Sequence, residues 1–386
     1  MTETATRPSK TELAIGVRGR TPLTERVARS DFTARQALED EIARAIAVRP
    51  SFVSFSGGRD SSAVLAVAVH MARARDLTPP QPVILRYPGD FDSDETEWQT
   101  LVLDHLGIDN PVIIELAERS TYLDADAQAS LRRHGLLYPA ALHLKNHIFP
   151  VASGGVLLTG EGGDEVLGTR RVTPYSLLLH YRRRPSRALL RWAWSAGSTA
   201  RGRARREAKD AARLLPWITE EARRLLTDDI AVEERAPLHW GRETQRMTSA
   251  RIPKALAHNL QLLADEYDVQ VAHPLLAPGF MFALAREGGR WGYAGRTDLM
   301  RHLFADLLPE ALLSRSSKAH FGAVRWGTPE REFARSWDGG GVPTDLVDVE
   351  ALRSEWLSDH PAGASVPLLH AAWLHSQGLP IEGEAA

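Results

Sequence analysis

Glycine, hydroxyl and acidic side chains follow one another in a short string early in the chain: Ser56-Gly57-Gly58-Arg59-Asp60-Ser61-Ser62. Glycine lets backbone N–H groups turn toward an anion, and the first turn of a helix adds N–H groups that lack partners. Ser56 and Ser61 can donate hydroxyl hydrogen bonds as well. Asp60 would repel a phosphate group unless a Mg²⁺ ion lay between them. The residue types therefore indicate a site for phosphate and Mg²⁺.

The surroundings of this string support the interpretation. A strand-like run, Phe52-Val53-Ser54-Phe55, precedes it, and a helix-like run follows from Ala63 to Ala74. A strand, a glycine pair and a helix start in this order form an anion site. The spacing differs from the G-x-x-x-x-G-K-[ST] pattern of Walker-type loops. A tight turn with an Asp or Ser helix cap would use the same residue types, so the string alone leaves that alternative open.

A second string, Gly160-Glu161-Gly162-Gly163-Asp164-Glu165, alternates glycines with acids directly after the apolar run at 156–159. Clustered carboxylates repel one another unless a metal ion or another cation neutralises them. If both strings lie at strand ends of one sheet, Asp60 and Asp164 can share a Mg²⁺ ion. Taken alone, the string could also be a glycine-rich surface loop or a calcium-type acidic loop. Its pairing with the first string favours a nucleotide site.

The elements that must position these strings alternate between strand-like and helix-like patterns. The expected strands cover 52–55, 83–87, 112–116 and 156–159, and the expected helices cover 34–47, 60–75, 94–106 and 120–149, the last broken at Pro139. This alternation predicts an α/β fold with a parallel sheet flanked by helices and with ligands at the carboxyl ends of the strands. After residue 175 the pattern becomes mostly helical, at 185–215, 245–265, 297–307 and 366–377.

Length and composition predict a cytoplasmic enzyme of two main parts. The chain has 386 residues, of which 43% are hydrophobic, and its formal net charge of −2 gives no reason to expect DNA or a membrane as a partner. The absence of cysteine excludes disulfides and thiolate chemistry, and residues 1–20 lack the apolar stretch of a signal peptide. We predict an N-terminal arm at 1–30, an ATP-pyrophosphatase α/β core at 31–175 and a mainly helical substrate-side region at 176–386.

A third string, Arg315-Ser316-Ser317-Lys318-Ala319-His320-Phe321, follows Leu308-Pro309. With these three strings the chain resembles, over about residues 35–330, the synthetase domain of asparagine synthetases. Relatives of that domain include β-lactam synthetases and lasso-peptide cyclases. The resemblance implies an adenine nucleotide α-hydrolase-like fold, with ATP and Mg²⁺ as cofactors. It also implies that the helical region returns Lys318 to the active site.

The resemblance assigns a role to each matching position. Asp60 and Asp164 would bind Mg²⁺, Ser56, Gly57, Gly58 and Ser61 would hold the pyrophosphate, Thr159 and Gly160 would lie against the adenosine, Lys318 would contact the phosphates during adenylation, and Glu161 would lie beside the reacting acyl carbon. An attacking amine must lose a proton, and Glu161 is the best-placed general base in the sequence.

Three features depart from that family. The family's phenylalanine, glycine and tyrosine pattern after the second string is replaced by Val166-Leu167-Gly168-Thr169-Arg170-Arg171. The stretch before Ser56 is too short for a separate glutaminase domain, since a self-sufficient domain needs more than about 50 residues. We therefore expect no glutamine hydrolysis, and the amine comes from free ammonia, from a partner protein or from the substrate itself. The family's substrate-side motif ends in Asp, whereas His273-Pro274-Leu275-Leu276-Ala277 ends in Ala. This difference leaves recognition of aspartate open.

We predict an ATP-dependent carbon–nitrogen ligase that adenylates a carboxylate, releases pyrophosphate and joins the acyl group to an amine. The acid and the amine can be small molecules or peptides. Three alternatives remain: a peptide macrolactam cyclase of the lasso type, a tRNA-modifying ligase that shares the first string, and a non-catalytic nucleotide-binding scaffold. Binding alone would not require Asp60, Glu161, Asp164 and Lys318 together.

Other conspicuous residues are predicted to be structural. His143 and His147 have helical i, i+4 spacing but lack a third metal ligand, so we expect packing or surface histidines. The arginine-rich stretch at 180–213 is expected to form a solvated helix face. Arg59 either reaches phosphate or faces solvent.

Overall fold

The computed structural model of the chain describes residues 6–16, 31–88, 94–116, 120–317 and 325–381. Strands and helices alternate through its first part, as the hydrophobic pattern predicts. These elements are α1 (Lys10–Ile15), α2 (Ala34–Ile46), β1 (Ser51–Ser54), α3 (Arg59–Ala74), β2 (Gln81–Arg86), α4 (Thr96–Leu106), β3 (Val112–Glu115), α5 (Ala125–His134), the 3₁₀ helix η1 (Leu142–His147) and β4 (Val156–Thr159).

Later elements are mostly helical. They are α6 (Gly163–Val166), α7 (Thr173–Tyr175), the π-helical η2 (Ser176–His180), α8 (Arg187–Gly197), α9 (Ala200–Leu214), α10 (Glu220–Glu233), α11 (Trp240–Met247), α12 (Arg251–Ala264), η3 (Asp265–Tyr267), β5 (Gln270–Ala272), η4 (Pro274–Leu276), α13 (Pro278–Gly288), α14 (Arg296–Phe304), α15 (Glu310–Leu313), α16 (Thr328–Ser336), α17 (Val349–Trp356), η6 (Gly363–Ser365) and α18 (Val366–Ser376).

Five parallel strands form one sheet in the order β3-β2-β1-β4-β5. This confirms the predicted fold class. The chain runs from β1 to β2 and β3 on one side of β1, then returns to add β4 on the other side. In the pairing of β1 with β4, Ser54 lies opposite Thr159, so the two glycine-rich strings start at the same level of the sheet. Ligands of such folds bind where the strand order reverses, which here is the carboxyl edge between β1 and β4.

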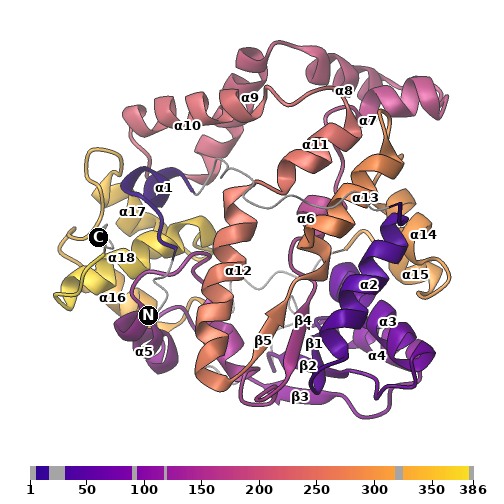
Figure 1. The fold of residues 1–386 in the computed structure, drawn as a ribbon. Coiled ribbons are helices and arrows are strands. Elements are labelled where there is room, and N and C mark those ends of the chain that lie inside the picture. Colours follow the sequence, from indigo (N-terminus) through magenta and orange to yellow (C-terminus); the bar gives the residue numbers. More distant parts are fainter. Residues whose placement is uncertain (1–5, 17–30, 89–93, 117–119, 318–324, 382–386) are drawn as a thin grey trace.

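Helices cover both faces of the sheet (Figure 1). Helices α2 and α3 lie on one face, where Leu38 and Leu65 are completely buried together with residues of α13 and α14. Helix α12 and η1 lie on the other face, around Phe149 and Leu260. Burial on both faces explains why the strands are short continuous apolar runs rather than alternating ones.

A second hydrophobic core lies among the C-terminal helices and α9 and α10 (Figure 1). Trp217 and Trp356 are fully buried there. Helix α1 also packs into this core through Leu13 and Ile15, and it contacts α10 and α18. The described part of the N-terminal arm is therefore a docked helix.

Three expected helices differ in detail. The helix expected at 120–149 is wrong beyond His134, because Gly135 ends α5 with φ 69° and only a 3₁₀ turn follows. The segments expected as single helices at 185–215 and 245–265 each contain a break, and Thr199 caps the helix that follows the first break. Strand β5 was not predicted.

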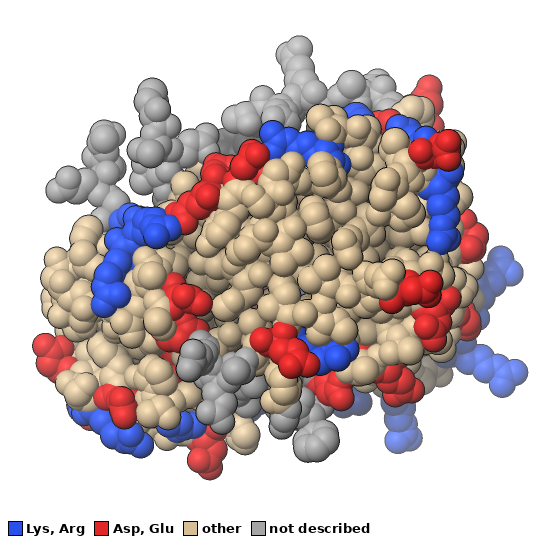
Figure 2. Space-filling model, turned by 90° about the horizontal axis from the view of Figure 1, so that it is seen from below, with Lys and Arg blue, Asp and Glu red and all other residues tan. Residues whose placement is uncertain are grey.

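Charged side chains are distributed unevenly over the surface. On the face shown in Figure 2 they lie mainly around the rim, and uncharged residues occupy the middle. Among the helices that the structure describes, none has the length and apolar character needed to cross a bilayer.

Candidate functional site

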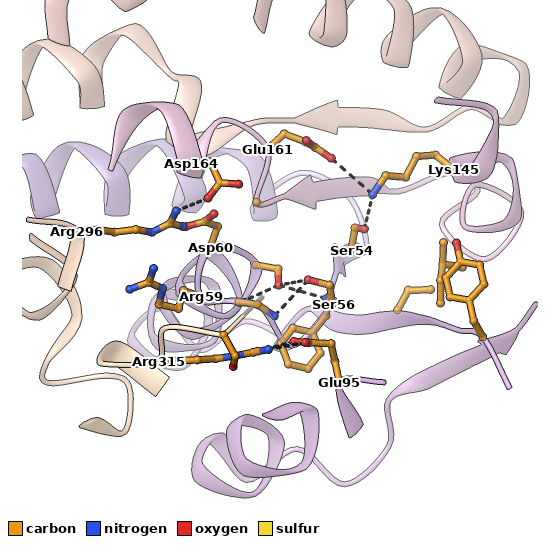
Figure 3. A pocket seen from close by; sticks show the side chains of 18 of the residues that line it. Ser54, Ser56, Arg59, Asp60, Glu95, Lys145, Glu161, Asp164, Arg296 and Arg315 are labelled. Carbon is orange, nitrogen blue, oxygen red and sulfur yellow. Dashed lines mark hydrogen bonds and ion pairs between the residues drawn. The ribbon is translucent and has the colours of Figure 1, made fainter. Parts of the chain in front are cut away.

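A cavity of about 450 Å³ opens at the carboxyl ends of β1 and β4, where the strand order reverses (Figure 3). Both glycine-rich strings line it. Its walls include the side chains or backbone of Ser56, Gly58, Asp60, Ser61, Gly160, Glu161 and Asp164. The two strings therefore meet at one site, as the sequence predicts. Gly57 and Thr159 lie behind this lining.

The first string folds back on itself before α3 begins. The Ser56 backbone N–H donates to Ser61 Oγ at 3.2 Å, and the two serine hydroxyls lie 3.1 Å apart. The N-cap residue of α3 is Gly58, which has no side chain to cap the helix. The N–H groups of the first helical turn are therefore left for a ligand, and the helix dipole favours an anion there.

Glycine in the second string lets the two loops touch. A Cβ atom at Gly160 would lie 2.6 Å from the backbone nitrogen of Ser61, and one at Gly163 would overlap the Asp60 carboxyl group. Any larger residue at either position would push the loops apart. The lack of side chains at Gly160 and Gly163 thus allows Asp60 and Asp164 to lie close to each other.

Asp60 and Asp164 both contact the guanidinium of Arg296 at the start of α14 (Figure 3). Arg296 Nη2 lies 2.5 Å from Asp60 Oδ1, and Nη1 contacts Asp164 Oδ1. Burial raises the pKa of Asp60, and the charge of Arg296 opposes that rise. The carboxylate pair therefore needs a cation to remain ionised.

This carboxylate pair also fits Mg²⁺. The ion prefers hard oxygen ligands and usually keeps waters and phosphate oxygens beside one or two carboxylates. Within the described residues, no three His, Cys, Asp or Glu side chains come together in a way that could hold a metal. The described chain would thus supply Asp60 and Asp164, and the phosphates of a nucleotide would complete the shell.

Glu161 occupies another part of the cavity, held by its backbone. Its N–H donates to Thr159 Oγ1 at 3.3 Å, and that hydroxyl lies 2.7 Å from His273 Nδ1. Since the hydroxyl already accepts from Glu161, its own hydrogen is available to His273. Burial lowers the pKa of His273 to about 4, so the ring is neutral at pH 7 and can accept. Thr159 and His273 together fix the backbone at Glu161.

A comparison with models of known protein families identifies the family to which this chain belongs. The family model described as asparagine synthase matches residues 33–373, which is most of the chain. The chain belongs to the asparagine synthase family. Members of this family are ATP-dependent ligases that form amides. A search of curated proteins found no match to this chain.

The third string of this asparagine synthase family protein begins beside the first. Arg315 Nη1 and Nη2 each lie 2.5 Å from a carboxylate oxygen of Glu95, and both side chains are almost fully buried. The guanidinium also stacks 4.6 Å from the ring centre of Trp98 and donates to the Gly57 carbonyl at 3.4 Å. Arg315 thus anchors its string to the phosphate-side loop. Lys318 lies outside the described residues, so its role stays a prediction.

Several cations of the cavity were missed by sequence reasoning. Lys145, from η1, donates to Ser54 Oγ at 2.9 Å and lies 3.8 Å from Glu161 Oε1. Arg296 and Arg325 also line the cavity, and Arg59 lines it instead of simply facing solvent. Lys145 belongs to a 3₁₀ turn and Arg296 to a distant helix, and neither lies in a recognisable string. No local signal could have found them.

His143 is a packing residue, as predicted. Its ring nitrogens lie 3.2 Å from the Ala140 carbonyl oxygen and 3.1 Å from that of Thr121. Burial lowers the pKa of His143 to about 4. A neutral imidazole has one N–H and donates to only one of these carbonyls, and its burial points to a packing role.

Proposed function

We propose that this protein adenylates a carboxylate with ATP and transfers the acyl group to an amine, releasing AMP and pyrophosphate. The observation that carries the proposal is the convergence of Asp60 and Asp164 next to the uncapped start of α3. Glu161 in the same cavity supplies the second half of the chemistry. Membership of the asparagine synthase family supports it.

In the first step, a carboxylate oxygen of the acid attacks the α-phosphorus of ATP. The new oxygen–phosphorus bond forms as the bond to pyrophosphate breaks. Negative charge grows on the departing pyrophosphate, where the N–H groups of the first turn of α3, the hydroxyls of Ser56 and Ser61, and Lys318 would stabilise it. Mg²⁺ held by Asp60 and Asp164 would neutralise part of the phosphate charge when bound.

In the second step, the amine attacks the acyl carbon of the adenylate. The carbon–nitrogen bond forms, the bond between carbon and the AMP oxygen breaks, and a proton leaves the amine. Glu161 accepts that proton as general base, a contribution typically worth about 10²–10⁴ in rate. The backbone contact with Thr159 holds Glu161 in place for this.

The experiment is nucleotide analysis with purified protein, ATP, Mg²⁺ and a panel of carboxylates and amines, with mass spectrometry of the products. AMP and pyrophosphate should appear together with an amide. ADP and phosphate would contradict adenylation. The mass of the product also separates amide formation between two molecules from ring closure within one.

The nitrogen source is a separate part of the proposal. We favour an amine-bearing substrate, because a bound carbon skeleton can hold the amine next to the acyl carbon, which free ammonia lacks. The chain should not use glutamine, because it has no cysteine for its hydrolysis. Enzyme given [¹⁵N-amide]glutamine, ATP and Mg²⁺ without a second protein should yield no labelled amide. Labelled product would overturn this part.

A further inference from the structure

Lys145 holds a positive charge in the cavity at some distance from the phosphate-side cations. In Figure 3 its ammonium lies beside Glu161, whereas Arg59 and Arg296 lie near Asp60 on the opposite side and Arg315 points to Glu95. Only 22% of its side chain is exposed, and the cavity accounts for that opening. A 3₁₀ turn packed against the sheet therefore delivers a lysine to the acyl side of the site.

The described neighbours of the Lys145 ammonium use only some of its hydrogen-bond donors. It donates one hydrogen bond, to the neutral hydroxyl of Ser54 at 2.9 Å. Glu161 Oε1 is 3.8 Å away, which is an ion pair but too long for a hydrogen bond. No further partner exists among the residues that the structure describes. An ammonium has three donors, so donors remain to be used by a ligand.

Removing a charge from water is costly unless an opposite charge compensates for it. Removal from water lowers the pKa of Lys145, while Glu161 raises it. Glu161 is also the proposed base, so it cannot serve as a permanent close partner. Of the anions that the proposed reaction brings into this cavity, the triphosphate would lie at the start of α3, so the carboxylate of the acid substrate is the one expected on the side of Lys145.

We propose that Lys145 binds the carboxylate of the acid substrate and holds its non-reacting oxygen through both steps. The inference rests on the proposed function and adds the residue that recognises the acid. Ser54 fixes the ammonium from the carboxyl end of β1, and Glu161 lies on the same side as the acyl carbon that the amine must reach.

The electron flow then involves Lys145 twice. One carboxylate oxygen bonds to the α-phosphorus and pyrophosphate leaves with the electron pair of the broken bond, while the other oxygen stays on Lys145. When the amine attacks, the carbonyl electrons move onto that oxygen as negative charge, which the ammonium stabilises. The charge returns to the carbonyl as AMP departs, and Glu161 receives the amine proton.

A labelling experiment tests acid binding without turnover. The folded protein is treated with a trace of acetic anhydride, and modification of Lys145 is compared with that of the exposed Lys209 by peptide mass spectrometry. Acetate or succinate should slow labelling of Lys145 several-fold relative to Lys209, whereas acetamide or succinamide should not. Equal effects of acid and amide would overturn the proposal. So would an unlabelled Lys145 in free enzyme, because the site must admit a small acid.

Variants provide the second test, with the acid that gives AMP in the wild type. Lys145→Met keeps the length of the side chain, and we expect it to raise KM for the acid at least about 10-fold and to lower kcat about 10²-fold, with ATP affinity within about 2-fold. Lys145→Arg should recover part of the loss. Unchanged acid kinetics in Lys145→Met would refute the role of Lys145 and leave the proposed function standing. If acids protected Lys145 from labelling but no AMP formed with any of them, the role of Lys145 in binding the acid would stand and the proposed function would be refuted.

Discussion

The two glycine-rich loops and the arginine-rich segment at 180–213 are both rich in charge, but they place it differently. The segment holds ten arginines and two acidic residues. In the loops, charged groups from distant elements converge, and Asp60 and Asp164 meet one guanidinium. In the segment, every arginine side chain except that of Arg203 is exposed. Arg187 and Arg191 on α8 are exposed and form no ion pair with any described residue.

The difference shows that charge density alone does not make a site. Convergence needs elements that bring side chains together, and the parallel sheet does this at its carboxyl edge. Helix α8 instead presents Leu190 and Trp194, 50% and 72% exposed, among its arginines. Arg203 on α9 is an exception, since it is buried and pairs with Glu234. Most of the segment is a solvated helix face, as the sequence predicts.

The largest effect on activity is expected when the two carboxylates that meet at the site lose their charge. Asp60→Asn and Asp164→Asn should each lower AMP formation about 10²–10³-fold, and the double variant at least about 10⁴-fold, because preorganised charge at the phosphates is lost. Steady-state AMP release, with circular dichroism to confirm folding, measures this. The control Glu115→Gln removes an exposed carboxylate at the end of β3 and should change nothing. Near-normal rates in a folded aspartate variant would contradict the shared cation site.

Glu161→Gln should separate the two steps of the reaction. We expect transfer to the amine to fall about 10²–10⁴-fold, while the adenylate still forms, because the amide cannot accept a proton. Trapping the adenylate with hydroxylamine, which needs little base assistance, measures the first step. Glu165→Gln is the matched control from the same string, and its side chain is exposed. Equal loss of adenylate and amide would show that Glu161 is not the base.

Glu95→Gln should act on stability more than on chemistry. It leaves the buried Arg315 guanidinium without its bidentate partner, which typically costs about 3–5 kcal/mol. Urea unfolding measures the free energy of unfolding. The control Glu97→Gln lies two residues on, in the first turn of α4, and is exposed, so it should stay within about 0.5 kcal/mol. If Glu95→Gln were as mild as its control, the pair would not anchor the third string.

The smallest effect is expected on the basic surface. Arg187→Gln and Arg191→Gln together should change stability by less than about 0.5 kcal/mol and AMP formation by less than about 2-fold, since both side chains are exposed and neither pairs with an acidic residue in the part of the chain that the structure describes. The same unfolding and AMP assays apply. A large loss of activity with these two changes would mean that the segment contributes to substrate binding, and the contrast between the regions would fail.

Much of the site could be predicted because its chemistry is local in sequence. Each loop follows a strand directly, so glycines, hydroxyls and acids stand next to one another. Four of the five strands were predicted for the same reason, as short apolar runs. The prediction that Asp60 and Asp164 approach each other required only that their strands share a sheet.

The rest could not be predicted because it depends on contacts between distant segments. Arg296 is separated from Asp60 by 236 positions and from Asp164 by 132. Strand β5 has three residues and is defined by its pairing with β4, not by a pattern of its own. Lys145 lies in a 3₁₀ turn where an α-helix was expected after the break at Pro139, and a helical pattern would not have placed it beside Ser54.

The way the chain is shared between its hydrophobic cores has a consequence for how the protein unfolds. Leu13 and Tyr122 belong to the core of the C-terminal helices, whereas Trp240 and Leu313 belong to the core of the sheet. The backbone therefore crosses between the cores several times, and neither core can lose its order without releasing segments of the other. We expect one cooperative melting transition, and fragments cut near residue 175 should be insoluble apart.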